Sequence, residues 1–456
     1  MGSEWKEYKL RDVARVITGK TPPGTLDQHF GGDVLFVTPG DMDELKHISN
    51  TSRTLSIEGQ KSISRIIFDR GIVVSCIGWQ MGKSAIVKQR AATNQQINTV
   101  IADESIIDMD FLFYVLKSKR EQIFQLGATA TRTPIVKKSL FEKISFKAPS
   151  LSEQKKISEC LSSIDDKIEL NREMNATLEA MAQALFKSWF VDFDPVIDNA
   201  LAAGNPIPDE LAERAERRAK GAQQQSPEHP HTLPAAIRQQ FPDRFVFTET
   251  MGWVPEGWTS EPLDSIASYH NGLALQKFRP KDDESEYLPV VKIAQLKKGY
   301  ADGEEKASPN IKPECIIDNG DVVFSWSGSL VVDIWCGGKA ALNQHLFKVT
   351  SDSFPKWFYH QFTCHHLEEF QRIAADKAVT MGHIKREHLR QALCVVPPLT
   401  LLADCSDAFK SLLDKSIETR LESRQLELLR DTLLPKLLSG QLRIPEAEQL
   451  VAEVTS

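Results

Sequence analysis

Hydrophobic residues recur every three or four positions through the middle of the chain, from Pro149 to about Phe190. Alternating steps of three and four are typical of a coiled-coil seam rather than of the wider apolar face of a globular helix. Ser150 and Glu153 make a capping box directly after the proline. We therefore predict one helix of roughly 57 Å, at 1.5 Å per residue. Its seam consists of Ile157, Leu161, Ile164, Ile168, Leu178, Ala182, Leu185 and Trp189.

Two asparagines, Asn171 and Asn175, occupy this seam midway. A buried Asn in a seam costs stability but fixes the register and the number of helices. The apolar surplus around Met174, Met181, Phe186 and Trp189 exceeds what one seam needs. It predicts a second buried face, with the alternative that Phe186 and Trp189 cover the adjoining domain.

A second long helical stretch covers residues 412–444. Pro435 is expected to kink or end it, and Gly440 follows at a plausible stop. Its seam is Leu413, Ile417, Leu421, Arg424 and Leu428. We expect the two stretches to pair as antiparallel helices. The residues predicted to pair the helices or to bind a partner are Ile164, Ile168, Asn171, Asn175, Leu178, Met181, Leu185, Phe186, Trp189, Ile417, Leu421 and Leu428.

Residues 1–150 and 251–400 share one sequence pattern. Each region combines short β-branched segments bounded by Gly, Asp or Pro, which indicate buried strands, with one helical segment. NQQINTV (94–100) is echoed by NQHLFKV (343–349). Near the end of each region, Ile135, Leu140 and Pro149 match Ile384, Leu389 and Pro398, each 249 residues later. The chain is therefore predicted to contain two copies of one domain.

The repeat predicts an α+β fold, in which two similar domains are separated by two long antiparallel helices and related by a pseudo-two-fold axis. The region between the first helix and the second domain is rich in proline, with one short charged helix at 210–220, and is predicted to be a partly ordered linker. The expected boundaries are 1–150 for the first domain, 151–195 for the central helix, 196–250 for the linker, 251–399 for the second domain, 400–444 for the C-terminal helix and 445–456 for a tail.

Composition is ordinary for a globular protein, with 41% hydrophobic and 26% charged residues. No run of 18 apolar residues and no secretory signal are visible, and seven scattered cysteines favour a reducing cytoplasm over a disulfide framework. The net charge of −7 argues against a nucleic-acid binder. Residues 1–150, however, carry 21 Lys and Arg against 16 Asp and Glu, so this part of the chain suits contact with phosphate groups.

Motifs for catalysis are missing from the sequence. It contains no Gly-rich cofactor loop and no GxxxxGK[ST] phosphate loop. An amine-binding Asn-Pro-Pro-aromatic motif is approached only at 205–208, where the third residue is Ile207. His360 and Cys364 share a helical face, but a zinc site needs three or four convergent ligands and the first copy has neither residue. We expect no catalytic site and no metal site.

Several of these stretches resemble the specificity (S) subunits of type I restriction–modification systems. Residues 163–195 resemble the central conserved region of that family, and DTLLPKLLSGQLRI (431–444) resembles its C-terminal conserved region. GWVPEGW (252–258) resembles the entry to the second recognition domain. The resemblance covers nearly the whole chain and is most specific in the helices, because the recognition domains vary within the family.

The resemblance implies a cytoplasmic, non-catalytic subunit with two target-recognition domains, each reading one half of a bipartite double-stranded DNA target. It implies that two modification subunits, which carry S-adenosylmethionine and methylate adenine, dock on the helices. Restriction subunits that use ATP and Mg would complete the complex, so no cofactor is expected in this chain. The alternatives are a self-contained adenine DNA methyltransferase, and a scaffold or decoy that does not contact DNA.

DNA contacts are predicted at two matching places in each copy. Loops with small residues and Thr allow backbone N–H groups to approach phosphates, while Lys and Arg reach phosphates or bases. One place is the loop after the helix, at 127–138 in the first copy and 380–386 in the second; the other is the loop after the GIVVSCIG strand and its echo. The predicted residues are Thr129, Thr131, Arg132, Lys137, Lys138, Gln80, Lys83, Ser327, Ser329, His383, Lys385 and Arg386.

Overall fold

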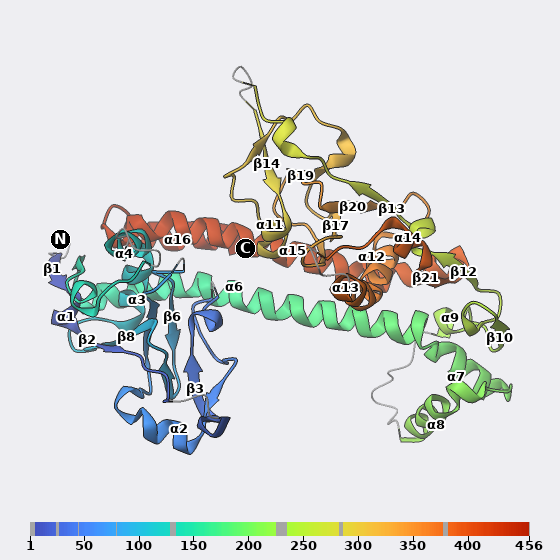
Figure 1. The fold of residues 1–456 in the computed structure, drawn as a ribbon, viewed down its shortest axis with the longest axis horizontal. Helices are drawn as coiled ribbons and strands as arrows, with labels where there is room; N and C mark the ends of the chain where they lie inside the picture. The colour runs from blue at the N-terminus through green and yellow to red at the C-terminus, as the bar shows by residue number, and fades with distance from the viewer. Residues whose placement is uncertain are drawn as a thin grey trace. The chain divides into compact units, whose positions relative to one another are not determined.

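The computed structural model describes residues 5–23, 27–43, 45–78, 80–127, 134–224, 235–281, 286–376 and 382–455. The chain forms two compact units (Figure 1). The first contains residues 1–171 and 422–456, and the second contains residues 172–421. Each unit therefore combines one globular domain with parts of both long helices.

The first domain is built on an antiparallel four-stranded sheet. Its strand order is β2 (Ala14–Thr18), β8 (Ile97–Ala102), β5 (Gly71–Ser75) and β6 (Ser84–Val87). Every residue of β5 is buried, as its run of β-branched residues indicated. A smaller sheet contains β4 (Thr54–Leu55), β3 (Phe30–Val37) and β7 (Ala91–Thr93), with β3 and β7 parallel.

Helices and one further strand pair complete this domain. Helix α3 (Met109–Ser118) is apolar on most sides and buried, and the Asp108 carboxylate caps it by accepting from the Phe111 N–H at 2.9 Å. The remaining elements are β1 (Lys6–Lys9) paired with β9 (Ser145–Ala148), and α1 (Leu10–Val13), α2 (Ile57–Ser62), α4 (Arg120–Gly127) and α5 (Lys138–Phe141).

The second domain repeats this strand order, which confirms the predicted duplication. Its main sheet runs β13 (Ser268–Asn271), β20 (Leu346–Thr350), β17 (Val322–Ser325), β18 (Val332–Ile334). Its smaller sheet contains β15 (Lys306–Ala307), β14 (Leu288–Val291), β19 (Ala340–Leu342) and β16 (Ile316–Ile317), and β14 and β19 are again parallel. The other elements are β12 (Thr259–Pro262) paired with β21 (Leu393–Val396), and α10 (Leu263–Ile266), α11 (Ile293–Lys298), α12 (Lys356–His365), α13 (Leu367–Asp376) and α14 (Arg386–Gln391).

The matching of the two copies near their ends was predicted one residue out of register. Ile135 bridges Ile77 as His383 bridges Ser327, so Ile135 corresponds to His383 and not to Ile384. The same shift makes the buried Phe141, rather than the exposed Leu140, the counterpart of Leu389. The error arose because Ile135 and Leu140 are of the same residue types as Ile384 and Leu389, which lie one position beyond their structural counterparts.

The central helix α6 (Leu151–Phe186) continues as a π-helix over Lys187–Val191. Within the first unit it runs antiparallel to α15 (Leu399–Leu438): Asp165 meets Arg430, and the Asn171 amide donates to Glu422 at 2.8 Å. Within the second unit the Thr419 hydroxyl donates to the Asn175 side-chain oxygen at 2.8 Å. Both seam asparagines therefore lie where the two helices touch.

The predicted seam packs against the globular domains as well as against the facing helix. Ile164 and Ile168 belong to the core of the first domain, where Leu426 and Leu433 join them. Phe186 and Trp189 belong to the aromatic core of the second domain, with Leu185, Ile417 and Leu421 packed against it. The alternative that these two aromatics cover the adjoining domain is thus the correct one.

One seam assignment is wrong, because Leu428 is 54% exposed and is not buried between the helices. Met181, which was predicted on a second buried face of the helix, is 53% exposed. Leu426, which is fully buried, occupies the inward position predicted for Leu428. Leu178 is half-buried. Because the helix pair also packs against a domain, its inward positions follow a wider face than a two-helix seam requires.

The C-terminal region is more helical than predicted. Helix α15 begins at Leu399, passes through Pro435 and ends shortly before Gly440, whose φ of 72° is accessible to glycine. The expected tail is helix α16 (Ile444–Thr455), which places Ala447 in the core of the first domain.

The predicted linker also contains regular structure. It includes α7 (Asp194–Ala203), α8 (Asp209–Gln224), α9 (Ala235–Arg238) and a hairpin of β10 (Phe245–Thr248) and β11 (Gly252–Pro255). Helix α8 confirms the short charged helix expected at 210–220. Arg214 and Arg218 of α8 make bidentate hydrogen bonds to Asp194 and Asp198 of α7. These ion pairs order a region whose prolines indicated a linker.

Candidate nucleic-acid interface

Three segments of the first domain that lie far apart in the sequence are hydrogen-bonded at one place. The Cys76 N–H donates to the Gln96 carbonyl at 2.8 Å, and the Val136 N–H donates to the Cys76 carbonyl at 2.9 Å. The Gly78 N–H donates to the Pro134 carbonyl at 3.0 Å. We call residues 76–78, 80–83, 94–96 and 134–138, with their counterparts 326–330, 343–345 and 382–386, the loop junction of each domain.

The loop junction of the second domain has the same bonds. The Trp326 N–H donates to the His345 carbonyl at 3.3 Å, and the Ile384 N–H donates to the Trp326 carbonyl at 3.0 Å. The Gly328 N–H donates to the Gly382 carbonyl at 2.8 Å. In each domain, the two loops that the sequence predicted to contact DNA thus lie together. A turn that begins with Asn-Gln, at 94–96 in the first domain and 343–345 in the second, is the third segment of the loop junction.

This Asn-Gln turn was missed as a functional candidate, although its repetition was visible in NQQINTV and NQHLFKV. The side-chain oxygen of Asn94 accepts from the Gln96 N–H at 3.0 Å, and that of Asn343 accepts from the His345 N–H at 3.2 Å. Such Asx turns fix the backbone two residues onward. The signal that could have revealed it is the recurrence of the same polar pair between two buried strands.

In the first domain, the predicted contacts that can be placed are mostly exposed. Lys137, Lys138 and Gln80 are exposed, and the Lys138 ammonium lies 3.5 Å from a Glu142 carboxylate oxygen. Lys83 is half-buried and donates to the Met42 carbonyl at 3.3 Å. Thr129, Thr131 and Arg132 lie outside the described residues.

In the second domain, Ser329, Lys385 and Arg386 are exposed, and His383 is half-buried beside the Trp326 ring. Ser327 is only 4% exposed, and its hydroxyl is 2.9 Å from the His345 ring Nδ1. Its side chain therefore supports the loop junction from inside, and the prediction that it reaches DNA has to be revised. The sequence placed it beside the correct loop but could not show its direction.

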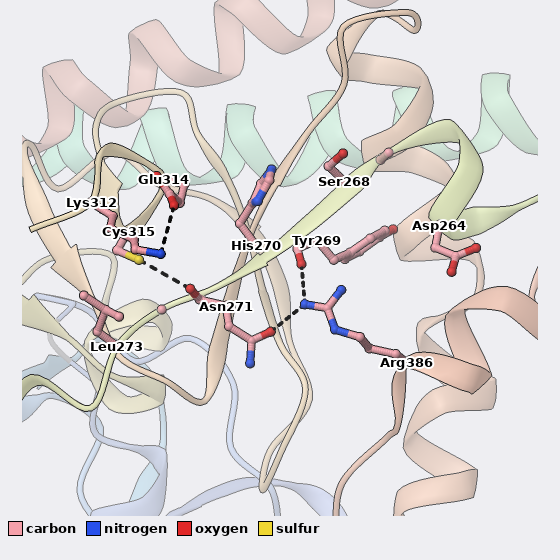
Figure 2. A pocket seen from close by; sticks show the side chains of 12 residues that line it. Asp264, Ser268, Tyr269, His270, Asn271, Leu273, Lys312, Glu314, Cys315 and Arg386 are labelled. Atoms are coloured by element: carbon pink, nitrogen blue, oxygen red, sulfur yellow. Dashed lines mark hydrogen bonds and ion pairs between the residues drawn. The ribbon is translucent and has the colours of Figure 1, made fainter.

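Arg386 is held in a defined position. Its Nη2 donates to the Tyr269 carbonyl and to the Asn271 side-chain oxygen, each at 2.9 Å (Figure 2). Its guanidinium lies 5.4 Å from the centre of the Phe347 ring. It borders an open cavity of about 500 Å³, with Lys312 and Glu314 among the other lining residues. A guanidinium has five N–H donors, so donors remain for an anion or a base edge.

Buried thiols and imidazoles near these regions are poor candidates for chemistry. Burial raises the pKa of the Cys76 thiol to about 12, which keeps it protonated and weakly nucleophilic. In α12, burial lowers the pKa of His360 to about 4 and raises the pKa of Cys364 to about 12. These two side chains approach at 3.6 Å, and the described residues contain no group of three or more potential metal ligands.

Comparison with known proteins finds similarity to specificity subunits of type I restriction enzymes. Residues 2–180 match the family described as the type I restriction modification DNA specificity domain. The MjaIX specificity subunit of a type I restriction enzyme from Methanocaldococcus jannaschii is 25% identical over 97% of this chain and 94% of its own length. The HindI specificity subunit from Haemophilus influenzae is 24% identical over 96% of this chain and all of its own length.

The chain is similar to type I restriction–modification specificity subunits over nearly its whole length. Among solved structures, the type I S subunit from M. genitalium is similar with a TM-score of 0.48 and 13% identity, over 95% of this chain and 96% of that one. None of the described helices is long and apolar enough to cross a membrane.

Proposed function

We propose that this chain reads a bipartite double-stranded DNA target, with one half-site bound at the loop junction of each domain. The observation that carries the proposal is the repetition of one hydrogen-bond scheme in two domains. Equivalent loops are held in the same way while their side chains differ: Ile135 corresponds to His383, and Cys76 corresponds to Trp326. A common frame with different side chains suits two different half-sites.

The exposed lysines and Arg386 supply the sequence-independent part of binding in this proposal. Neutralising phosphates releases counterions, and each contact adds about one to the slope of log affinity against log salt. The overall charge of −7 means that the partner subunits supply much of the remaining neutralisation. The chain itself needs no catalytic group or cofactor in this role. S-adenosylmethionine would be bound by the modification subunits, and ATP and Mg by the restriction subunits.

We further propose that two modification subunits dock on the long helices. Four large apolar side chains on the described parts of the two long helices are exposed: Leu170 (51%), Met181 (53%), Leu399 (59%) and Leu428 (54%). Exposed leucines and methionines on a long helix suit a helix-to-helix contact with a partner, because burying each contributes about 1.5–3 kcal/mol. Leu428, which is wrong as a seam residue, and Met181, which was predicted on a second apolar face, are thus suited to partner binding.

The experiment uses the chain assembled with its modification subunits. Lys137→Ala combined with Lys138→Ala should weaken DNA binding uniformly across sequences and lower the salt slope by about two. A charge-matched control replaces Arg217 and Lys220, which are exposed on α8, and should leave the slope unchanged. Unchanged binding by the first variant would contradict contact at this loop junction.

Two further measurements separate the alternatives. The purified chain alone, incubated with S-adenosylmethionine and DNA, should incorporate no methyl groups, whereas incorporation would show a self-contained methyltransferase. A scaffold or decoy would assemble with the modification subunits but leave the complex without sequence preference. The proposal requires that the assembled complex methylates one defined bipartite motif.

A further inference from the structure

We propose that Gln95 and Gln344, at the tip of the Asn-Gln turn in each domain, contact an adenine in each half-site. The inference rests on the proposed DNA-reading function and names the residues that read one base. It starts from a structural coincidence: the two glutamines lie 249 residues apart on the same turn, between equivalent strands.

The turn is a rigid platform in both domains. The backbone N–H groups of Asn94 and Asn343 donate to Val37 and Val291 at 3.1 and 3.0 Å, which ties the turn to the smaller sheet. Both asparagine side chains are buried, so their amides serve the turn and not the solvent.

A glycine faces each turn at close range. A Cβ on Gly19 would lie 2.0 Å from the Asn94 carbonyl oxygen, and a Cβ on Gly272 would lie 2.4 Å from the Asn343 carbonyl oxygen. Real Cβ atoms do not approach this closely, so only glycine allows the neighbouring strand to close on the turn. A base-reading side chain needs such a fixed backbone, because bidentate hydrogen bonding depends on orientation.

The glutamine amides are oriented but remain accessible. Gln95 is exposed, and its side-chain oxygen accepts from the Thr21 hydroxyl at 2.6 Å. Gln344 is half-buried, and its amide nitrogen lies 3.4 Å from the His345 ring, whose other nitrogen is 2.9 Å from the Ser327 hydroxyl. Each amide thus has one anchoring contact. An amide offers two donors and an oxygen with two lone pairs, so enough groups remain for N6 and N7 of adenine.

Hydrogen bonds link each turn to segments that carry or lead to cationic side chains. In the second domain, Arg386 bonds to Asn271, and two residues further along the chain the Leu273 carbonyl accepts from the Gln344 N–H at 2.9 Å. In the first domain, Cys76 is bonded both to the turn and to the segment that leads to Lys137. A base-reading amide flanked by phosphate-binding cations is the usual arrangement in protein–DNA interfaces.

The identity of the two glutamines predicts a shared base, and their different neighbours predict different flanking bases. Gln96 in the first domain is replaced by His345 in the second, and Ile135 by His383. We therefore expect both half-sites to contain an adenine that is recognised in the same manner, within otherwise different sequences.

The test measures methylation by the chain assembled with its modification subunits. The wild-type motif is first determined by long-read sequencing of methylated DNA, and rates are then measured on duplexes carrying each base at every motif position. Gln95→Ala should reduce discrimination at one adenine of one half-site by roughly 5- to 150-fold. Gln344→Ala should do the same in the other half-site only.

Gln95→Glu should create a new base preference rather than only remove one. A glutamate accepts from cytosine N4 but cannot donate to adenine N7, so the preferred base at that position should change from adenine to cytosine. Gln449→Ala, an exposed glutamine on α16, is the matched control and should leave the motif unchanged.

The outcomes distinguish this inference from the proposed function. If the wild-type complex methylates no defined bipartite motif, the DNA-reading function itself fails. If the wild type has such a motif and both alanine variants keep full discrimination, the assignment of these glutamines is overturned. A uniform loss of methylation on every duplex would also overturn it, since this would indicate a phosphate contact or a distorted turn rather than base reading.

Discussion

Arg430 of α15 and Asp165 of α6 form an ion pair inside the first unit that joins the two long helices. Arg430 Nη1 and Asp165 Oδ1 are 2.7 Å apart, and the side chains are only 11% and 5% exposed. The Tyr114 hydroxyl donates to the second carboxylate oxygen at 2.7 Å. Replacing Arg430 with Ala would leave a buried carboxylate without the cation that is hydrogen-bonded to it.

The expected loss can be estimated from this geometry. Removing one partner of a buried ion pair costs about 3–5 kcal/mol, because the remaining charge stays desolvated. In a unit of about 200 residues, each kcal/mol lowers the unfolding temperature by about 2–4 °C, which gives a decrease of roughly 6–20 °C. The exposed pair Lys415–Glu418, whose side chains are 49% and 69% exposed, is the control. Lys415→Ala should cost less than about 1 kcal/mol.

The assay is calorimetric unfolding of the wild type, Arg430→Ala, Asp165→Ala and the double variant. The double-mutant cycle isolates the coupling between the two side chains, which should amount to about 1–3 kcal/mol. A decrease for Arg430→Ala no larger than that for Lys415→Ala would refute the reasoning. It would show that water or a neighbouring group compensates the carboxylate.

Three further predictions follow from the same contacts. Although burial alone would raise the pKa of Asp165, Lys117 and Arg430 hold this pKa below its ordinary value. The ion pair therefore stabilises the fold above about pH 4, and this stabilisation is lost as the pH falls through the lowered pKa. The difference in unfolding temperature between wild type and Arg430→Ala should accordingly narrow at acidic pH. Gly19→Ala should cost about 1–3 kcal/mol in chemical denaturation, because its Cβ would meet the Asn94 carbonyl; an unchanged midpoint would mean that the turn is not rigid. Leu426→Ala should lower the free energy of unfolding by about 2–5 kcal/mol, because that side chain is fully buried. Leu428→Ala should change the free energy of unfolding by less than about 0.5 kcal/mol but should weaken assembly with the modification subunits, as measured by gel filtration. Equal stability losses would refute this assignment of the two leucines.

The features that could be predicted from the sequence were those that depend on local patterns, such as the spacing of apolar residues and repeated segments. Apolar spacing located α6 nearly to the residue, and the echo of NQQINTV in NQHLFKV revealed a duplication that strand order confirms. Turn and strand segments such as 71–75 were recognisable because full burial selects β-branched residues. These signals need no knowledge of which segments meet in space.

The features that escaped prediction depend on contacts between distant segments. The direction of Ser327 is set by His345, and the rigidity of the Asn-Gln turn is set by Gly19 and Gly272 from other strands. Leu428 fits a two-helix seam by spacing, but the domain packed beside the helices moves the buried face to Leu426. Tertiary packing decides among positions that local spacing leaves equivalent.

The central claim is that each domain reads its own half-site. The most direct measurement replaces the first domain, residues 6–148, by the corresponding domain of a similar specificity subunit and sequences the methylated motif of the assembled complex. We predict that one half-site changes completely while the other stays the same. A motif that changes in both halves, or in neither, would contradict the account.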